Sequence, residues 1–150
     1  MNTQIEIDNS LKAYKVILDF MKKLRTYFDN TYPAEYYTGS VYSGDITYFP
    51  FTPEVLKEQK LKIAIVFNHQ EMRFEIWLAG QNKQIQKKYW EIFKDSDWNK
   101  YHIPDNIDKS FSIVDNILVN NPDFNDSDFL REKIEEGVME FIDEIKEILK

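Results

Sequence analysis

The spacing of apolar residues changes once within residues 61–90, and this change predicts a hairpin followed by a helix. Residues 61–67 are rich in aliphatic and β-branched side chains, which favours a half-buried strand. After four polar residues, every second residue is apolar from Met72 to Leu78, which is the period of a second strand. Gly80 closes that strand. Asn82 then caps a helix whose apolar positions are Ile85, Tyr89, Ile92 and Phe93.

The second strand of this hairpin has two different faces. We expect one alternating set to face the core, namely Met72, Phe74, Ile76 and Leu78. The other set turns toward solvent, a groove or a partner, and it consists of Arg73, Glu75, Trp77 and Ala79.

Helical patterns occupy both ends of the chain. Residues 8–10 offer an N-cap to a first helix that Pro33 ends, with Leu11, Tyr14, Ile17, Leu18, Met21, Leu24 and Phe28 on one face. Asp126 or Ser127 caps the last helix, whose apolar face is Leu130, Ile134, Val138, Phe141, Ile145, Ile148 and Leu149.

The remaining segments are shorter. Residues 36–51 are aromatic and extended, and Pro50 favours an edge strand or its end. Thr52 caps a short helix that ends near Gln59, and a short strand is expected over residues 100–103. Residues 108–119 fit a short helix, although residues 117–119 alone also fit a strand.

Together these elements predict an α+β fold. Strands joined by short turns, with helices before and after them, favour a mainly antiparallel sheet of three to four strands. The long N- and C-terminal helices are expected to cover the face that carries Phe74, Ile76 and Leu78. No repeat or linker interrupts the chain, so residues 1–150 are expected to form one domain.

Composition narrows the environment and the partners. The chain has no cysteine, no apolar N-terminal leader and no apolar run long enough to span a bilayer, which predicts a cytoplasmic protein without a membrane association. The net charge is −7, and residues 123–150 hold ten acids against four bases. This acidity disfavours nucleic acid as a partner.

The sequence motifs predict no cofactor and no metal ligand. Gly39 and Gly44 have phosphate-loop spacing, but Asp45 follows where a lysine is required. The acids of residues 123–128 lack the glycine and glutamate of a calcium loop, so helix capping explains them. His69 and His102 stand in no metal-binding pattern.

The aromatic and charged strand residues carry the main functional hypothesis. We expect a ligand-binding face made of Lys62, Arg73, Glu75 and Trp77, bordered by Tyr42, Asp45 and Tyr48. There, Trp77 covers an apolar group while Arg73 and Glu75 orient a polar one.

A resemblance accompanies this interpretation. The chain resembles a family of small bacterial proteins that is classed as a domain of unknown function, through the segments LRTYF (24–28), ITYFPFTPEVLKEQKLKIAIVF (46–67), RFEIWLAGQNKQIQKKYW (73–90) and ILVNNPDF (117–124). The resemblance implies a bacterial origin and a free-standing domain, and it brings no activity, cofactor or catalytic residue.

Three functions stay open at this point. The leading hypothesis is a non-enzymatic domain that binds a small molecule or a protein. The alternative is a metal-dependent, nuclease-like hydrolase with Asp45 and Glu75 on adjacent strands and Lys62 nearby. The third is a structural module in which the aromatic strand or the last helix forms an interface. A monomer or a homodimer is expected.

Overall fold

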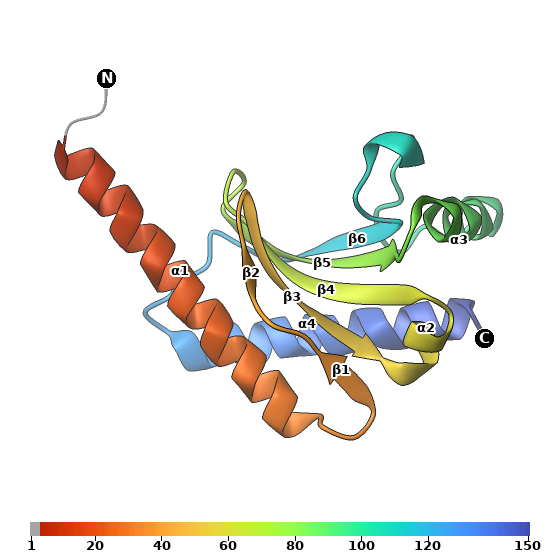
Figure 1. Ribbon diagram of the computed structural model, residues 1–150, viewed down its shortest axis with the longest axis horizontal. Coiled ribbons are helices and arrows are strands. Elements are labelled where there is room, and N and C mark those ends of the chain that lie inside the picture. The colour runs from red at the N-terminus through yellow and green to blue at the C-terminus, as the bar shows by residue number, and fades with distance from the viewer. Residues whose placement is uncertain (1–3) are drawn as a thin grey trace.

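The computed structural model describes residues 4–150, with side chains from Ser10 onward. The described part contains four α-helices, one 3₁₀ helix and six strands (Figure 1). In chain order they are α1 (Gln4–Thr31), β1 (Tyr36–Thr38), β2 (Tyr42–Ser43), β3 (Ile46–Pro53), α2 (Glu54–Glu58), β4 (Leu61–Asn68), β5 (Arg73–Gly80), α3 (Lys83–Asp95), η1 (Ile107–Lys109), β6 (Val114–Asn120) and α4 (Ser127–Ile148). None of these helices is long and apolar enough to cross a membrane.

All strands pair antiparallel in one sheet of order β1-β3-β4-β5-β6, and β2 joins it by pairing with β3. The β4–β5 hairpin is its centre, with an unbroken register from Leu61 opposite Gly80 to Asn68 opposite Arg73. The α+β class and the antiparallel sheet are confirmed. The predicted strand number was too low, because the sheet has six strands.

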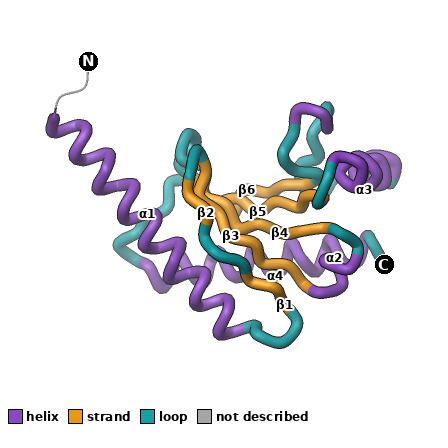
Figure 2. The backbone as a smooth tube through the Cα atoms, viewed as in Figure 1, coloured by secondary structure: helices purple, strands orange, loops and turns teal. Residues whose placement is uncertain are grey.

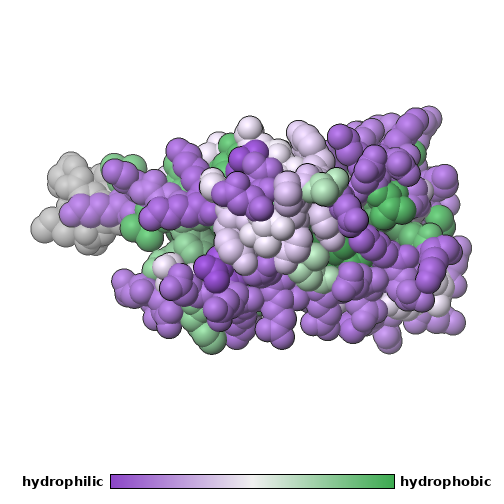
Figure 3. Space-filling model, turned by 90° about the horizontal axis from the view of Figure 1, so that it is seen from below, coloured by the Kyte–Doolittle hydropathy of each residue, from purple (hydrophilic) through white to green (hydrophobic). Residues whose placement is uncertain are grey.

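The core lies between one sheet face, which we call the inner face, and the two long helices (Figure 2). Phe28 of α1 contacts Phe49 and Phe51 of β3, and Phe20 of α1 contacts Phe74 of β5. The helix α4 packs mainly beneath β5 and β6 and buries the apolar stripe Leu130, Ile134, Val138, Phe141, Ile142 and Ile145. With these stripes turned inward, the surface seen from below is mostly hydrophilic, with separate hydrophobic patches (Figure 3).

A carboxylate joins the two long helices. Glu135 of α4 accepts hydrogen bonds from the hydroxyls of Tyr27, at 2.8 Å, and Tyr32. The Arg131 guanidinium lies 4.5 Å from the Tyr27 ring. The hydrogen bond to Glu135 raises the pKa of the Tyr27 hydroxyl, because the proton is held between the two oxygens.

Local sequence explains the central hairpin and the helix after it. Asn68 closes the turn by accepting hydrogen bonds from the backbone N–H groups of Gln70 and Glu71. Met72 has a φ of 53° and is 41% exposed, so the prediction that it faces the core is wrong. The cap of α3 is confirmed, because the side chain of Asn82 accepts a hydrogen bond from the N–H of Ile85 at 2.9 Å.

Residues 108–119 do not form the predicted helix. They contain the end of η1 and most of β6, whose residues pair with β5 from Leu78 opposite Val114 to Arg73 opposite Asn120. A register shift beside Phe74 and Glu75 adds an extra residue to β6, which disguises the strand period. Residues 100–103 contribute only a single bridge, between His102 and Asp115.

Three further boundaries differ from the sequence prediction. Pro50 lies in β3, which has neighbours on both sides, so the edge-strand prediction is wrong. The carbonyl of Pro50 accepts from Gly39, and its missing N–H therefore faces the interrupted side between β1 and β2. Pro53 rather than Thr52 precedes α2, because the Thr52 hydroxyl bonds the backbone of Ile63 instead. The helix α1 begins at Gln4, before residues 8–10.

His69 ties the middle of α1 to the sheet. Its ring stacks on Tyr14 with centroids 4.9 Å apart, and its Nε2 lies 2.7 Å from the hydroxyl oxygen of Thr47. Burial lowers the pKa of His69 below its ordinary value.

This environment predicts a pH dependence of stability. Because the folded state favours neutral His69, the unfolded state binds the proton more tightly. The free energy of unfolding should therefore be highest above about pH 6.5, the ordinary histidine pKa, and should fall as the pH drops below it. Urea unfolding of the wild type and of His69→Gln between about pH 7.5 and 5 measures this, and the variant should show the smaller decrease. An equal decrease in wild type and His69→Gln would contradict the assignment.

Candidate functional site

The face of the sheet opposite α1 and α4, which we call the outer face, carries the predicted polar and aromatic residues. Cross-strand pairing places Tyr48, Val66 and Glu75 in one row across β3, β4 and β5. The next row contains Ala64 and Trp77. The period-two prediction for Arg73, Glu75 and Trp77 is thereby confirmed.

Glu75 is the organising residue of the outer face. It is 5% exposed, which is rare for a carboxylate. Its Oε2 accepts hydrogen bonds from Arg73 Nε at 2.8 Å and from Asn68 Nδ2 at 3.0 Å, while its Oε1 accepts from Trp77 Nε1 at 2.8 Å. Burial of this group is tolerated because both oxygens have donors and a cation lies beside them. Arg73 and Trp77, the two side chains most suited to recognition, are therefore held in place by Glu75.

Arg73 and Trp77 offer different groups to a ligand. The guanidinium of Arg73 uses Nε for Glu75, and its two terminal amino groups have no hydrogen-bond partner among the described residues. Trp77 is half-buried, and its ring stacks on Phe111 with centroids 6.4 Å apart and planes inclined by 4°. Phe111 is 83% exposed, so the pair forms an aromatic ridge beside the sheet.

A hollow of about 310 Å³ lies against this ridge. Glu75 and Trp77 line it from the sheet, while Lys109 lines it from the end of η1 and Phe111 from the segment that follows. Asp115 of β6 contributes a carboxylate at the same place. The hollow has both apolar and charged walls.

The other predicted site residues lie farther out. Tyr42 and Tyr48 contact each other at the β2–β3 end, with ring centroids 5.3 Å apart. Asp45 is exposed in the turn between β2 and β3. Lys62 lies opposite Ala79, at the other end of the face, where it lines a second hollow beside α3. Glu75 and Trp77 therefore lie between Arg73, which is in the last row at the hairpin end, and Lys62 at the opposite end, while Asp45 lies beyond the start of β3.

The predicted pairing of Asp45 with Glu75 on adjacent strands is wrong. The strand β4 lies between β3 and β5, so roughly 10 Å of sheet separates even Tyr48 from Glu75. Both Glu75 oxygens are already used as acceptors. Among the side chains that the structure describes, from Ser10 onward, no group of three histidine, cysteine or acidic residues comes together in a way that could hold a metal.

A second polar cluster lies beside the hollow that Trp77 lines. The hydroxyl of Ser112 donates to Asp115 Oδ2 at 2.8 Å, and His102 Nδ1 lies 3.1 Å from both Asp115 oxygens. A catalytic serine triad places histidine between serine and the acid. Here the acid is in the middle, so the geometry fastens residues 102 and 112 to β6 and does not activate Ser112.

Sequence reasoning missed two residues of this site. Asn68 was assigned to the polar turn, yet its amide reaches Glu75, and its position at a strand end is compatible with both roles. Phe111 lies within residues 108–119, for which the sequence predicts a short helix. Nothing in the local sequence marks its stacking on Trp77, because the two residues are brought together by the path from η1 to β6.

A family model described as "Domain of unknown function (DUF7000)" matches residues 1–149. The chain belongs to this family. The predicted resemblance to a family of unknown function is confirmed, and the bacterial origin stays a prediction. No curated protein and no solved structure matches this member of the DUF7000 family.

The Glu75 network predicts a measurable loss on substitution. In Glu75→Gln, an amide N–H₂ must face one of the donors that the carboxylate now satisfies. We expect the free energy of unfolding to fall by about 1–3 kcal/mol, measured by urea unfolding at neutral pH.

Glu71→Gln is the matched control, since Glu71 is exposed in the β4–β5 turn. It should change stability by less than about 0.5 kcal/mol. Equal effects of the two substitutions would show that the network contributes nothing to folding.

Proposed function

We propose that this domain is a non-enzymatic binding module and that the outer face is its binding surface. The observation that carries the proposal is the buried Glu75 carboxylate, which holds Arg73 and Trp77 in fixed positions on a face that neither long helix covers. A side chain held in its binding conformation loses less entropy when a ligand arrives.

The chemistry of the exposed groups supports recognition. The terminal amino groups of Arg73 are suited to a carboxylate, phosphate or carbonyl group, because they are planar donors with a permanent charge. The aromatic ridge of Trp77 and Phe111 offers an apolar surface for the rest of the ligand. Tyr42 and Tyr48 extend the aromatic surface toward the β2–β3 turn.

The arrangement favours binding over hydrolysis. The acids proposed for metal-dependent chemistry, Asp45 and Glu75, are separated by β4. The Ser112 hydroxyl bonds to Asp115 and not to a histidine. The Glu75 carboxylate already accepts hydrogen bonds from Asn68, Arg73 and Trp77.

The ligand in this proposal is a small molecule or an exposed segment of a protein. The hollow of about 310 Å³ beside Trp77 falls at the lower end of small-molecule sites. A cytoplasmic location, a single domain over residues 1–150 and a monomeric or homodimeric state remain part of the proposal.

Thermal unfolding in the presence of a compound panel tests this function. The panel contains divalent metals, nucleotides, common metabolites and oligonucleotides. A ligand at about a hundred times its dissociation constant adds ~2.7 kcal/mol, which should raise the midpoint by several degrees. We expect a small organic compound to do so with the wild type, and the shift to disappear in Arg73→Gln and Trp77→Phe.

Lys23→Gln and Trp98→Phe serve as controls, because neither residue lines the hollow beside Trp77. They should retain the shift. A shift that survives in Arg73→Gln and Trp77→Phe would place the ligand elsewhere and contradict the proposal. Absence of any shift would contradict a small-molecule ligand and direct the search to a protein partner.

A further inference from the structure

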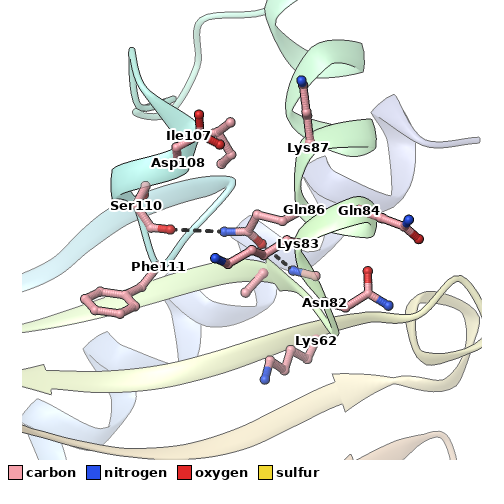
Figure 4. Close-up of a pocket in the computed structure, with 12 residues that line it drawn as sticks. Lys62, Asn82, Lys83, Gln84, Gln86, Lys87, Ile107, Asp108, Ser110 and Phe111 are labelled. Atoms are coloured by element: carbon pink, nitrogen blue, oxygen red, sulfur yellow. Dashed lines mark hydrogen bonds between the residues drawn. The ribbon is translucent and has the colours of Figure 1, made fainter.

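A larger hollow lies at the Lys62 end of the outer face, where three segments meet (Figure 4). Its volume is about 600 Å³, which is within the range of small-molecule sites. The ends of β4 and β5 form its floor, the first turns of α3 form one side, and residues 107–111 form the other.

The walls of this hollow are fixed to each other by Gln86. Its Oε1 accepts a hydrogen bond from the N–H of Gly80 at 2.6 Å, and its Nε2 donates to the carbonyl of Ser110 at 3.5 Å. A Cβ on Gly80 would lie 2.6 Å from the backbone nitrogen of Gln86, so α3 can approach the strand only because glycine stands there. The hollow is therefore a built feature of the fold.

Positive charge gathers around it. Lys62 comes from β4, and Lys83 and Lys87 come from α3, while Asp108 is the one acid of the lining. Among the described residues, none of these lysines forms an ion pair with a carboxylate. In Figure 4 the side chain of Lys83 extends toward the Phe111 side, that of Lys62 points downward in the view from the floor of the hollow, and that of Lys87 points upward, away from both.

This arrangement is unfavourable for the empty protein. The first turn of α3 contains no acid and begins with Lys83, although the helix dipole favours negative charge there. Lys83 and Lys87 are also a like-charged pair four residues apart. An anion bound between Lys62 and Lys83 would offset the unfavourable interaction of Lys83 with the helix dipole and its repulsion by Lys87. This local positive charge stands in a protein whose net charge is −7.

An apolar wall completes the hollow. Ile107 and Ala79 line it, and the exposed ring of Phe111 stands at its edge. One side of that ring is stacked on Trp77, which fixes its orientation. A ligand with a flat unsaturated group can pack that group against the ring of Phe111 while its charged group stays near Lys62 and Lys83.

We propose that this hollow binds a small organic anion, in which a carboxylate, phosphate or sulfonate group pairs with Lys62 and Lys83 and a flat ring packs beside Phe111. This inference goes beyond the proposed function, because it assigns a ligand class of its own to a second hollow, which neither Arg73 nor Trp77 lines. Lys62 and Lys83 are its charge-recognition residues, and Phe111 supplies the apolar contact.

The fluorescent probe 1-anilinonaphthalene-8-sulfonate combines the two required features, a flat ring and a fixed negative charge. Titration of the folded protein with this probe should give saturable fluorescence enhancement that weakens as salt is added. In the double variant Lys62→Gln/Lys83→Gln the dissociation constant should rise roughly tenfold, as expected for loss of charge-assisted contacts. Phe111→Ala should also weaken binding, at unchanged charge.

Lys22→Gln/Lys23→Gln is the matched control, because it removes the same charge from the exposed side of α1. Its affinity should equal that of the wild type. Equal affinity in the Lys62/Lys83 variant, or no saturable binding by the wild type, would overturn the inference. Circular dichroism of each variant checks that it is folded, and only folded variants are compared. The two proposals fail separately, since Arg73→Gln and Trp77→Phe leave Lys62 and Lys83 in place.

Discussion

A carboxylate that is almost fully buried on a sheet face requires partners for both of its oxygens. Removing such a group from water costs several kcal/mol, and only charge-assisted hydrogen bonds of good geometry offset that cost. Glu75 meets this requirement with donors from Asn68, Arg73 and Trp77. Arg73 and Trp77 are also the charged and aromatic groups of the outer face. The hydrogen bonds that stabilise the Glu75 carboxylate therefore fix the positions of these two side chains as well.

The two sheet faces consequently serve different purposes. The inner face is packed by α1 and α4 with aromatic and aliphatic side chains, and the Tyr27–Glu135 hydrogen bond joins these helices to each other. The outer face presents an ordered aromatic and charged surface with two hollows, and Phe111 lines both of them. The segment from η1 to β6 shapes both hollows, so the irregular part of the chain determines where a ligand can fit.

The spacing of apolar residues predicted most of the helices and strands. It also predicted which residues of β5 lie on each face of the sheet. Alternation in residues 73–78 separated Phe74 and Ile76 from Glu75 and Trp77, since neighbouring strand residues point to opposite faces. Residues 114–120 were predicted wrongly because Val114, Ile117 and Leu118 also fit a helical spacing. Pairing with β5, which no local pattern encodes, makes this segment a strand. The contacts of the candidate site depend on strand order and on the path of residues 104–112, and these were beyond prediction from one sequence.

If Glu75 holds Trp77 in place before any ligand binds, the indole N–H of Trp77 is protected by its hydrogen bond to Glu75. Hydrogen exchange of the tryptophan indole N–H groups, followed by nuclear magnetic resonance, tests it with internal standards. Trp90 donates to the Pro104 carbonyl at 2.7 Å, and the Trp98 indole N–H has no partner among the described residues. The Trp77 indole proton should exchange slowly, as that of Trp90 does, and Glu75→Gln should accelerate Trp77 alone. Exchange of Trp77 as fast as that of Trp98 in the wild type would contradict the account.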